Sequence, residues 1–180
     1  WLNLFGREET QALCAADNEM PPLTVRVNLL KSGRRELMEK LIQAGFQVEE
    51  TPISPDGIRV SFSPSPIQKT AFFAEGLLRL QDEASQLIAY LVNPQKGQKI
   101  LDVCAGSGGK ATHLAALMKN EGRIVALDRN PEKIEQLRNN ASKMGIGIVE
   151  AARSDGEIPL SSEYHNQFDA VFVDAPCSGT

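Results

Sequence analysis

A glycine-rich turn is the feature of the chain whose residue types and spacing point most clearly to chemistry. It runs from Gly106 to Ala111, follows an apolar strand and opens a helix. Glycines permit a tight turn and let a ligand approach the backbone, and the start of the helix presents free N–H groups to a polar or anionic group. The spacing predicts a cofactor site, and it also fits the G-x-G-x-x-A pattern of dinucleotide enzymes. A turn without a ligand is the plainer alternative, but three glycines in four residues weaken a helix start.

Three aspartates near the turn help to distinguish between cofactors. Asp128 ends the next strand, where a carboxylate holds the ribose hydroxyls of either cofactor class; a charge at the following helix start is the alternative. Asp102 lies inside the strand before the turn, and its charge suits a cationic amino-acid tail, as in S-adenosylmethionine, but repels a pyrophosphate. Asp155 follows the third strand, where it is placed to reach an adenine amino group or is simply an exposed loop acid.

An acid and a thiol follow the fourth strand, at Asp174 and Cys177. Catalytic groups gather at the carboxyl ends of strands in open α/β sheets. Carbon 5 of cytosine becomes nucleophilic when a thiolate adds at carbon 6 and an acid hydrogen-bonds or protonates ring nitrogen 3, so the two residues could divide these tasks. A free thiol with a pKa of about 8.5 would need local activation. The alternative is a buried structural cysteine beside a loop acid.

The elements that must position these residues fall into two regions. Residues 1–75 form the first, a small α+β domain in which a weak N-terminal helix precedes a strand over 23–30, a helix over 31–44 and strands over 47–50 and 58–62. In residues 76–180, helices over 81–92, 110–119 and 131–143 alternate with strands over 99–104, 123–127, 147–151 and 168–173. This alternation of helices and apolar strands predicts an α/β fold with a parallel, doubly covered sheet. The Ser63–Pro66 segment is the best candidate for a linker.

Basic residues of the first region either form a face for RNA or are a solvated surface. They are Arg26, Lys31, Arg34, Arg35 and Lys40. The net charge of -4 argues mildly against a nucleic-acid binder, although a local basic patch can lie on an acidic protein. His113, near the glycines, is assigned no role.

The motifs resemble those of the Sun-type (Fmu-like) RNA 5-methylcytosine methyltransferases, most closely the bacterial ribosomal-RNA branch. The matching motifs are Asp102-Val-Cys104-Ala-Gly-Ser-Gly-Gly-Lys110, Ala126-Leu-Asp128, Ser154-Asp155-Gly156 and Asp174-Ala-Pro-Cys177-Ser-Gly179. The segments Val25-Arg-Val-Asn28 and Leu80-Gln-Asp-Glu-Ala-Ser85 match as well, so the resemblance covers nearly the whole chain.

This resemblance implies a Rossmann-like class I methyltransferase sheet behind a small RNA-recognition-like domain. It implies that S-adenosylmethionine is bound by Cys104, Ala105, Gly106, Ser107, Gly108, Gly109, Lys110, Asp128, Asp155 and Asp174. It also implies that Cys177 assists product release, whereas the nucleophile lies in a later Thr-Cys motif. We therefore expect the 180-residue chain to be an inactive fragment, with its fourth strand on an open sheet edge. Where the family usually has Ala-Pro, this chain has Gly106-Ser107, and the loss of proline loosens the turn.

Composition sets wider limits on the function. The three cysteines lie far apart and form no C-x-x-C pair, which predicts no metal site and a reducing, cytoplasmic location. The chain has no apolar run of about 18 residues, so we expect no membrane span. We expect a monomer that acts on RNA. A nicotinamide-dependent oxidoreductase and a non-catalytic RNA-binding module are the alternatives.

Overall fold

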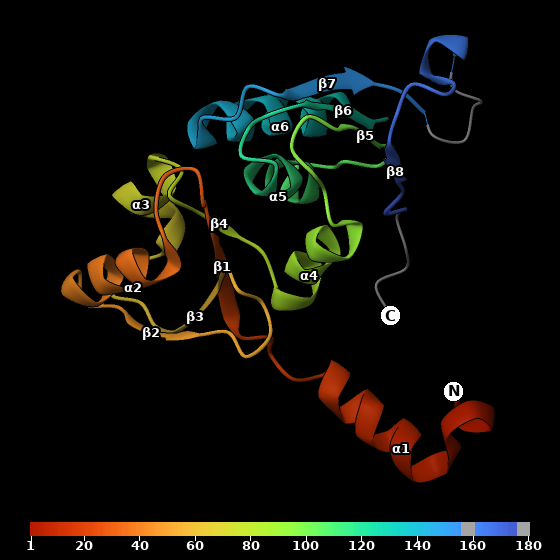
Figure 1. The fold of residues 1–180 in the computed structure, drawn as a ribbon. Helices are drawn as coiled ribbons and strands as arrows, with labels where there is room; N and C mark the ends of the chain where they lie inside the picture. Colours follow the sequence, from red (N-terminus) through yellow and green to blue (C-terminus); the bar gives the residue numbers. More distant parts are fainter. Residues whose placement is uncertain (156–160, 176–180) are drawn as a thin grey trace.

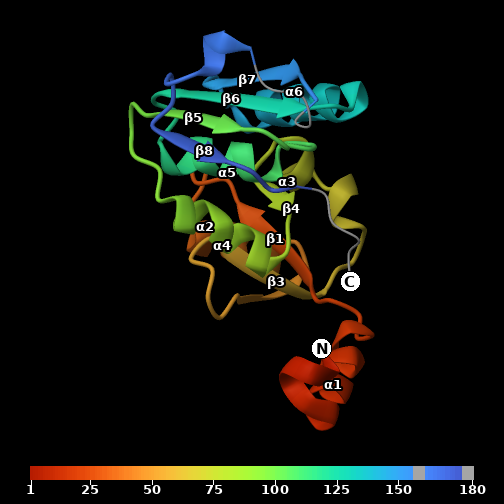
Figure 2. The same cartoon turned by 90° about the vertical axis from the view of Figure 1, so that its right-hand side faces the viewer.

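Two sheets of different kinds organise the chain, which the computed structural model describes over residues 1–155 and 161–175. The first sheet has the order β2-β3-β1-β4 and is antiparallel, whereas the second has the order β7-β6-β5-β8 and is parallel. Figures 1 and 2 show the two sheets with helices between them and α1 standing apart. The structure confirms the α/β fold with a parallel sheet.

The small sheet is built from short strands that bury one apolar face. Its strands are β1 (Leu23–Val27), β2 (Gln47–Glu50), β3 (Gly57–Phe62) and β4 (Leu78–Leu80). Helix α2 (Arg34–Gln43) covers it with Leu37 and Leu41, and α3 (Ala71–Ala74) follows the 3-10 turn η1 (Ile67–Lys69). The predicted division at residue 75 leaves β4 outside the sheet to which it belongs, because three residues are too few for a recognisable pattern.

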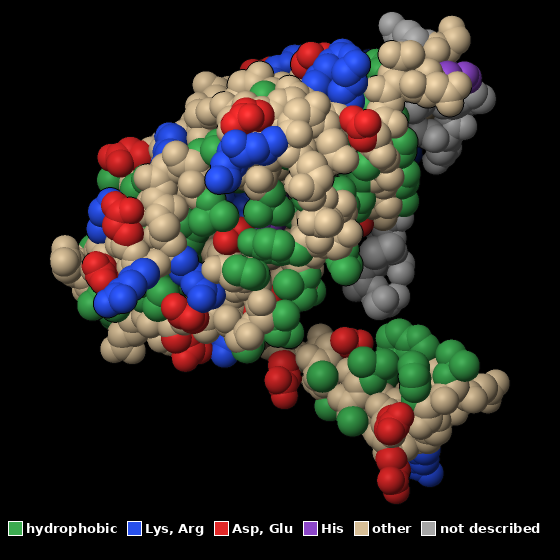
Figure 3. Space-filling model, in the orientation of Figure 1, with side chains coloured by type: hydrophobic (Ala, Val, Ile, Leu, Met, Phe, Trp, Pro, Cys, Tyr) green, Lys and Arg blue, Asp and Glu red, His purple; other side chains and the backbone are tan. Residues whose placement is uncertain are grey.

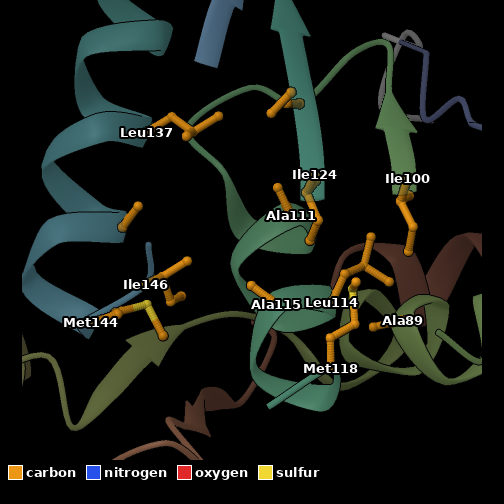
Figure 4. Packing of buried hydrophobic residues seen from close by; sticks show 13 residues of the cluster. Ala89, Ile100, Ala111, Leu114, Ala115, Met118, Ile124, Leu137, Met144 and Ile146 are labelled. Carbon is orange, nitrogen blue, oxygen red and sulfur yellow. The ribbon is translucent and has the colours of Figure 1, made fainter. Parts of the chain in front are cut away.

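The parallel sheet carries the glycine-rich turn at its carboxyl edge. Its strands are β5 (Lys99–Asp102), β6 (Arg123–Asp128), β7 (Val149–Arg153) and β8 (Ala170–Phe172), and its helices are α4 (Glu83–Val92), α5 (Gly109–Leu117) and α6 (Pro131–Met144). In Figure 4, side chains of these helices meet Ile100 and Ile124 on one face of the sheet. On the other face, Tyr164 from the turn η2 (Ser162–Tyr164) and Phe168 pack over Leu127. Both faces of the central strands are therefore buried, which explains their continuous apolar sequence.

The outer parts of the described chain are less covered. Helix α1 (Leu2–Asp17) is bent at Gly6, buries none of its residues and exposes Leu4 and Phe5. Among the described residues strand β8 pairs with β5 alone, and Val171 at this edge is 61% exposed. Within the described residues, no helix combines the length and apolar character needed to cross a membrane.

A buried polar cluster joins the small sheet to α4 and α5. The Oδ2 atom of Asp56, before β3, lies 2.9 Å from Nε2 of His113 and accepts a 2.6 Å hydrogen bond from the Tyr90 hydroxyl. Burial lowers the pKa of His113 to about 4, so the ring is neutral at pH 7. Since Nδ1 of the ring has no hydrogen-bond partner among the described residues, we assign Nε2 as the nitrogen that donates to Asp56. The cluster thus connects segments that are far apart in sequence.

Removing this acceptor should weaken the whole chain. Asp56→Ala leaves the buried His113 ring and the half-buried Tyr90 hydroxyl without their partner, and we expect it to lower the free energy of unfolding by about 3 kcal/mol. Urea denaturation at pH 7 measures the change, with Asp17→Ala on the exposed helix α1 as the control. A loss below about 0.5 kcal/mol, as for a typical surface substitution, would show that the cluster does not stabilise the fold.

Candidate functional site

A cavity of about 350 Å³ lies between the glycine-rich turn and the segment that links β4 to α4. The turn and the ends of β5 and β8 form one wall, and the β4–α4 segment forms the other. The lining residues are Arg79, Leu80, Gln81, Asp82, Ser85, Asp102, Cys104, Ala105, Gly106, Ser107, Gly109, Lys110 and Asp174. A cavity of this size at the carboxyl edge of a parallel sheet is the expected place for a ligand.

The backbone of the turn requires glycine at two positions. Gly106 has φ 55° and Gly108, the N-cap of α5, has φ 85°. A Cβ atom on Gly108 would also lie 2.7 Å from Cγ of Leu137. This close approach packs the turn against α6 and leaves the first N–H groups of α5 at the cavity, where they can bind an anionic group.

Asp102 is a buried carboxylate with no partner in the described part of the chain. It ends β5, is 0% exposed, and neither of its oxygens accepts a hydrogen bond from a described residue. Burial raises the pKa of Asp102 to about 7, and the carboxylates of Asp174 and Asp128 add to this effect, while the nearby backbone N–H of Cys104, which does not reach hydrogen-bond geometry, and the Lys110 ammonium oppose it. Because a buried acid without a partner is unfavourable, the geometry indicates a ligand that brings a positive charge.

An ion pair between Lys110 and Asp174 links the start of α5 to the residues that follow β8. Nζ of Lys110, on α5, forms an ion pair with Oδ2 of Asp174, which follows β8. The ion pair keeps Asp174 at the rim of the cavity. Cys104 also lines the cavity, but burial and the nearby acids, led by Asp102, raise the pKa of its thiol. Cys104 therefore stays protonated and is unsuited to act as a nucleophile.

Seven of the predicted cofactor residues line the cavity: Cys104, Ala105, Gly106, Ser107, Gly109, Lys110 and Asp174. Gly108 lies behind the surface, against Leu137. Asp128 lies outside the lining set, and its carboxylate accepts hydrogen bonds from the amides of Gly106, at 2.9 Å, and Asn130, at 2.8 Å. Asp155 follows β7 and is also outside the lining set. Cys177 lies outside the described residues.

Residues of the β4–α4 segment form a wall of the cavity that reasoning from the residues did not assign. Arg79 and Gln81 are the main polar groups there, and Asp82 caps α4 by accepting a 3.1 Å hydrogen bond from the Ser85 amide. The available signal was the match of the Leu80–Ser85 segment to the methyltransferase family, which assigned no role to it.

Of the residues considered for a basic face, Arg26 does not contribute to the surface, and acidic partners offset most of the others. Arg26 is 0% exposed and points into the protein. The remaining arginines of this group and Lys40 form ion pairs, namely Arg34–Glu50, Arg35–Glu39 and Lys40–Glu36. Figure 3 shows basic and acidic side chains interspersed over this domain. These ion pairs favour the solvated-surface interpretation for Arg34, Arg35 and Lys40.

Comparison with protein families identifies the chain. A model described as "16S rRNA methyltransferase RsmB/F" matches residues 89–180, which is just over half of the chain. The chain belongs to this family. A second model, the ferredoxin-like domain of RsmF/B-like methyltransferases, matches residues 1–68. The RsmB/F match covers the parallel sheet and the glycine-rich turn, and the ferredoxin-like match covers α1 and most of the small sheet.

Individual relatives agree with this assignment. A "Probable ribosomal RNA small subunit methyltransferase B" from Bacillus subtilis is 34% identical over 99% of this chain, and the chain spans 40% of that protein's length. The crystal structure of a methyltransferase homologue from Pyrococcus horikoshii is 30% identical, with a TM-score of 0.86, and covers 98% of this chain and 57% of its own. NSun6 from Pyrococcus horikoshii, solved with SFG, is 19% identical with a TM-score of 0.84, covers 98% of this chain and 68% of its own, and supports the fold alone.

Proposed function

We propose that the cavity binds S-adenosylmethionine. The observation that carries this proposal is the unpartnered carboxylate of Asp102 beside the start of α5. The amino-acid tail of this cofactor has an ammonium group, which would pair with Asp102, and a carboxylate, which the first N–H groups of α5 would bind. A pyrophosphate in the same place would face the buried acid. When bound, S-adenosylmethionine supplies a methyl group attached to a sulfonium.

The same proposal assigns roles to the predicted cofactor residues. Ala105, Gly106, Ser107 and Gly109 would contact the cofactor along the turn, and Lys110 would hold Asp174 beside it. Asp128 would accept hydrogen bonds from the ribose hydroxyls once these replace the Gly106 amide as its partner. Asp155 would contact the adenine. The contact of Asp128 with the Gly106 amide supports this step, because it shows that the carboxylate already lies against the turn.

The reaction proposed for the longer protein is methyl transfer to carbon 5 of a cytosine in ribosomal RNA. The chain spans 40% of the Bacillus subtilis relative, so we assign this activity to the longer protein and not to these 180 residues alone. Asp174, at the rim of the cavity, would hydrogen-bond ring nitrogen 3 of the cytosine, and Cys177 would assist product release. The protein would act as a monomer on RNA in the cytoplasm.

Loss of the Asp174 carboxylate should remove most of this activity. General acid–base groups contribute about 10²- to 10⁴-fold to rate, so we expect Asp174→Ala in the full-length protein to leave 5-methylcytosine in 16S rRNA below about a tenth of the wild-type level. Nucleoside mass spectrometry of 16S rRNA from a deletion strain complemented with each variant measures this. Asp169→Asn, at an exposed acid before β8 whose contact with the Lys99 amide an amide oxygen can keep, is the control. Full restoration by Asp174→Ala would exclude a catalytic role for this residue.

A further inference from the structure

Two arginines of the small sheet lie side by side and reach the glycine-rich turn. Arg26 on β1 and Arg79 on β4 are directly opposite each other in the antiparallel pairing of these strands. Like charges in such positions repel. Burial lowers the pKa of both guanidinium groups, to about 9 for Arg26, where the neighbouring Arg79 adds to the effect. An unfavourable pair of this kind needs compensating contacts, and the turn provides them.

Arg79 holds the turn at Ser107. Its Nη2 atom donates to the backbone oxygen of Ser107 at 3.0 Å and to the Ser107 hydroxyl at 2.9 Å. On the other side, Nδ2 of Asn140 on α6 donates to the same backbone oxygen at 3.0 Å. The serine that follows the flexible Gly106 is therefore fixed from the small sheet and from α6 together.

Arg26 holds the next part of the turn. Its Nη1 atom donates to the backbone oxygen of Gly109 at 2.6 Å and to the side-chain oxygen of Gln81, and Nη2 donates to the Thr112 hydroxyl at 3.0 Å. Gly109 and Thr112 lie in the first turn of α5, and Gln81 lines the cavity. Through Arg26, the small sheet thus contacts the first turn of α5, whose N–H groups would face the ligand.

We propose that Arg79 is a positioning residue for the methyl-donor site, because its two hydrogen bonds to Ser107 restrain the turn before the ligand arrives. This role rests on the proposed binding of S-adenosylmethionine. It makes the small domain a part of the cofactor site, since β4 supplies the restraint from outside the parallel sheet. A ligand that meets a restrained turn loses less conformational freedom on binding.

The role can be separated from a general effect on folding by a second way of restraining the turn. Ser107 is absent from the residues with positive φ, and its amide donates no hydrogen bond to a described residue. Proline has a negative φ and lacks an N–H group, so neither the sign of φ at Ser107 nor its amide argues against proline there. Ser107→Pro should therefore replace the restraint that Arg79 provides. It would not replace a contact needed only to join the two domains.

The experiment is calorimetric titration of the chain with S-adenosylmethionine, with amide hydrogen exchange of residues 104–110 in the cofactor-free protein. For Arg79→Gln we expect the Kd to rise about tenfold, as for a lost hydrogen bond to a charged donor, and exchange across the turn to become faster. Adding Ser107→Pro should bring both values back to within about threefold of wild type. Ser107→Ala, which removes only the hydroxyl acceptor, should raise the Kd about threefold. Arg59→Gln, on β3 and outside the cavity lining, is the control.

Each outcome bears on one claim. If the wild-type chain does not bind S-adenosylmethionine, the proposed function fails. If the wild type binds and Arg79→Gln leaves both the Kd and the exchange rates unchanged, the positioning role fails alone. A rise in Kd that Ser107→Pro does not reverse also overturns the role, because it assigns Arg79 to domain joining. If Arg79→Gln does not fold, Ser107→Ala decides through its Kd, and a value equal to wild type counts against the role.

Discussion

Replacing Asp102 by asparagine is expected to weaken S-adenosylmethionine binding about 100-fold while making the cofactor-free protein more stable by about 2 kcal/mol. The affinity falls because the buried carboxylate has no other partner among the described residues and the ligand's ammonium group would lose its counter-charge. The stability rises because asparagine avoids burying a charge. A purely structural acid would show the opposite sign in the second measurement.

The stability gain should depend on pH in a defined window. Burial raises the pKa of Asp102 from 3.8 to about 7. Between these values the unfolded chain is ionised while the folded protein keeps its proton, so the stability of the wild type falls as the pH rises. The advantage of Asp102→Asn should be absent below about pH 4, grow up to about pH 7 and then stay constant.

Urea denaturation of the cofactor-free chain at pH 4, 6 and 8, together with calorimetric titration at pH 8, measures both effects. Asp169→Asn is the control, because Asp169 is an exposed acid at the opposite, amino edge of the same sheet and its contact with the Lys99 amide can be made by an amide oxygen. If Asp102→Asn binds S-adenosylmethionine as tightly as the wild type, Asp102 is not the ammonium partner.

Gly108→Ala is expected to destabilise the fold by about 3 kcal/mol and to abolish measurable cofactor binding. The backbone at Gly108 has φ 85°, and the new Cβ would lie 2.7 Å from Cγ of the fully buried Leu137. Leu137 belongs to the core beneath the parallel sheet, which cannot yield without loss of packing. The turn would therefore have to move, and the first N–H groups of α5 would move with it.

The chain offers a control that separates backbone strain from the clash. Gly97 has φ 81°, but a Cβ there would meet nothing within 4 Å. Gly97→Ala should therefore cost only about 1 kcal/mol and leave cofactor binding intact. Thermal unfolding and calorimetric titration of both variants test this comparison. Equal losses of stability in the two variants would show that contact with Leu137 does not fix the turn.

Local sequence patterns predicted the parallel sheet correctly and named seven residues that line one cavity, whose role as a cofactor site stays a prediction. The glycines, Asp102 and the strand ends are informative because they lie within a few residues of one another, and the rules for strand ends and helix starts act at that range. Asn130 also caps α6 as expected, since its side chain accepts a 2.8 Å hydrogen bond from the Glu132 amide.

The contacts between the two sheets could not be predicted in this way. Arginine is usually found at the surface, and nothing near Arg26 in the sequence shows that it contacts Gly109, 83 residues later. The same holds for Asp56 and His113, whose burial depends on how the small sheet packs on α5. Strand β4 was missed because it has only three residues. These features arise from tertiary packing, which cannot be inferred from the periodicity of apolar residues in the sequence.

Calorimetric titration of the 180-residue chain with S-adenosylmethionine and, separately, with NADH is the most direct test of the central claim, that the turn beside Asp102 binds a methyl donor. The account predicts one-to-one binding of S-adenosylmethionine that Asp128→Ala weakens, and no detectable binding of NADH at the same concentrations. Tight binding of NADH without binding of S-adenosylmethionine would contradict it and favour an oxidoreductase. Binding of neither would leave only an RNA-binding role for this part of the protein.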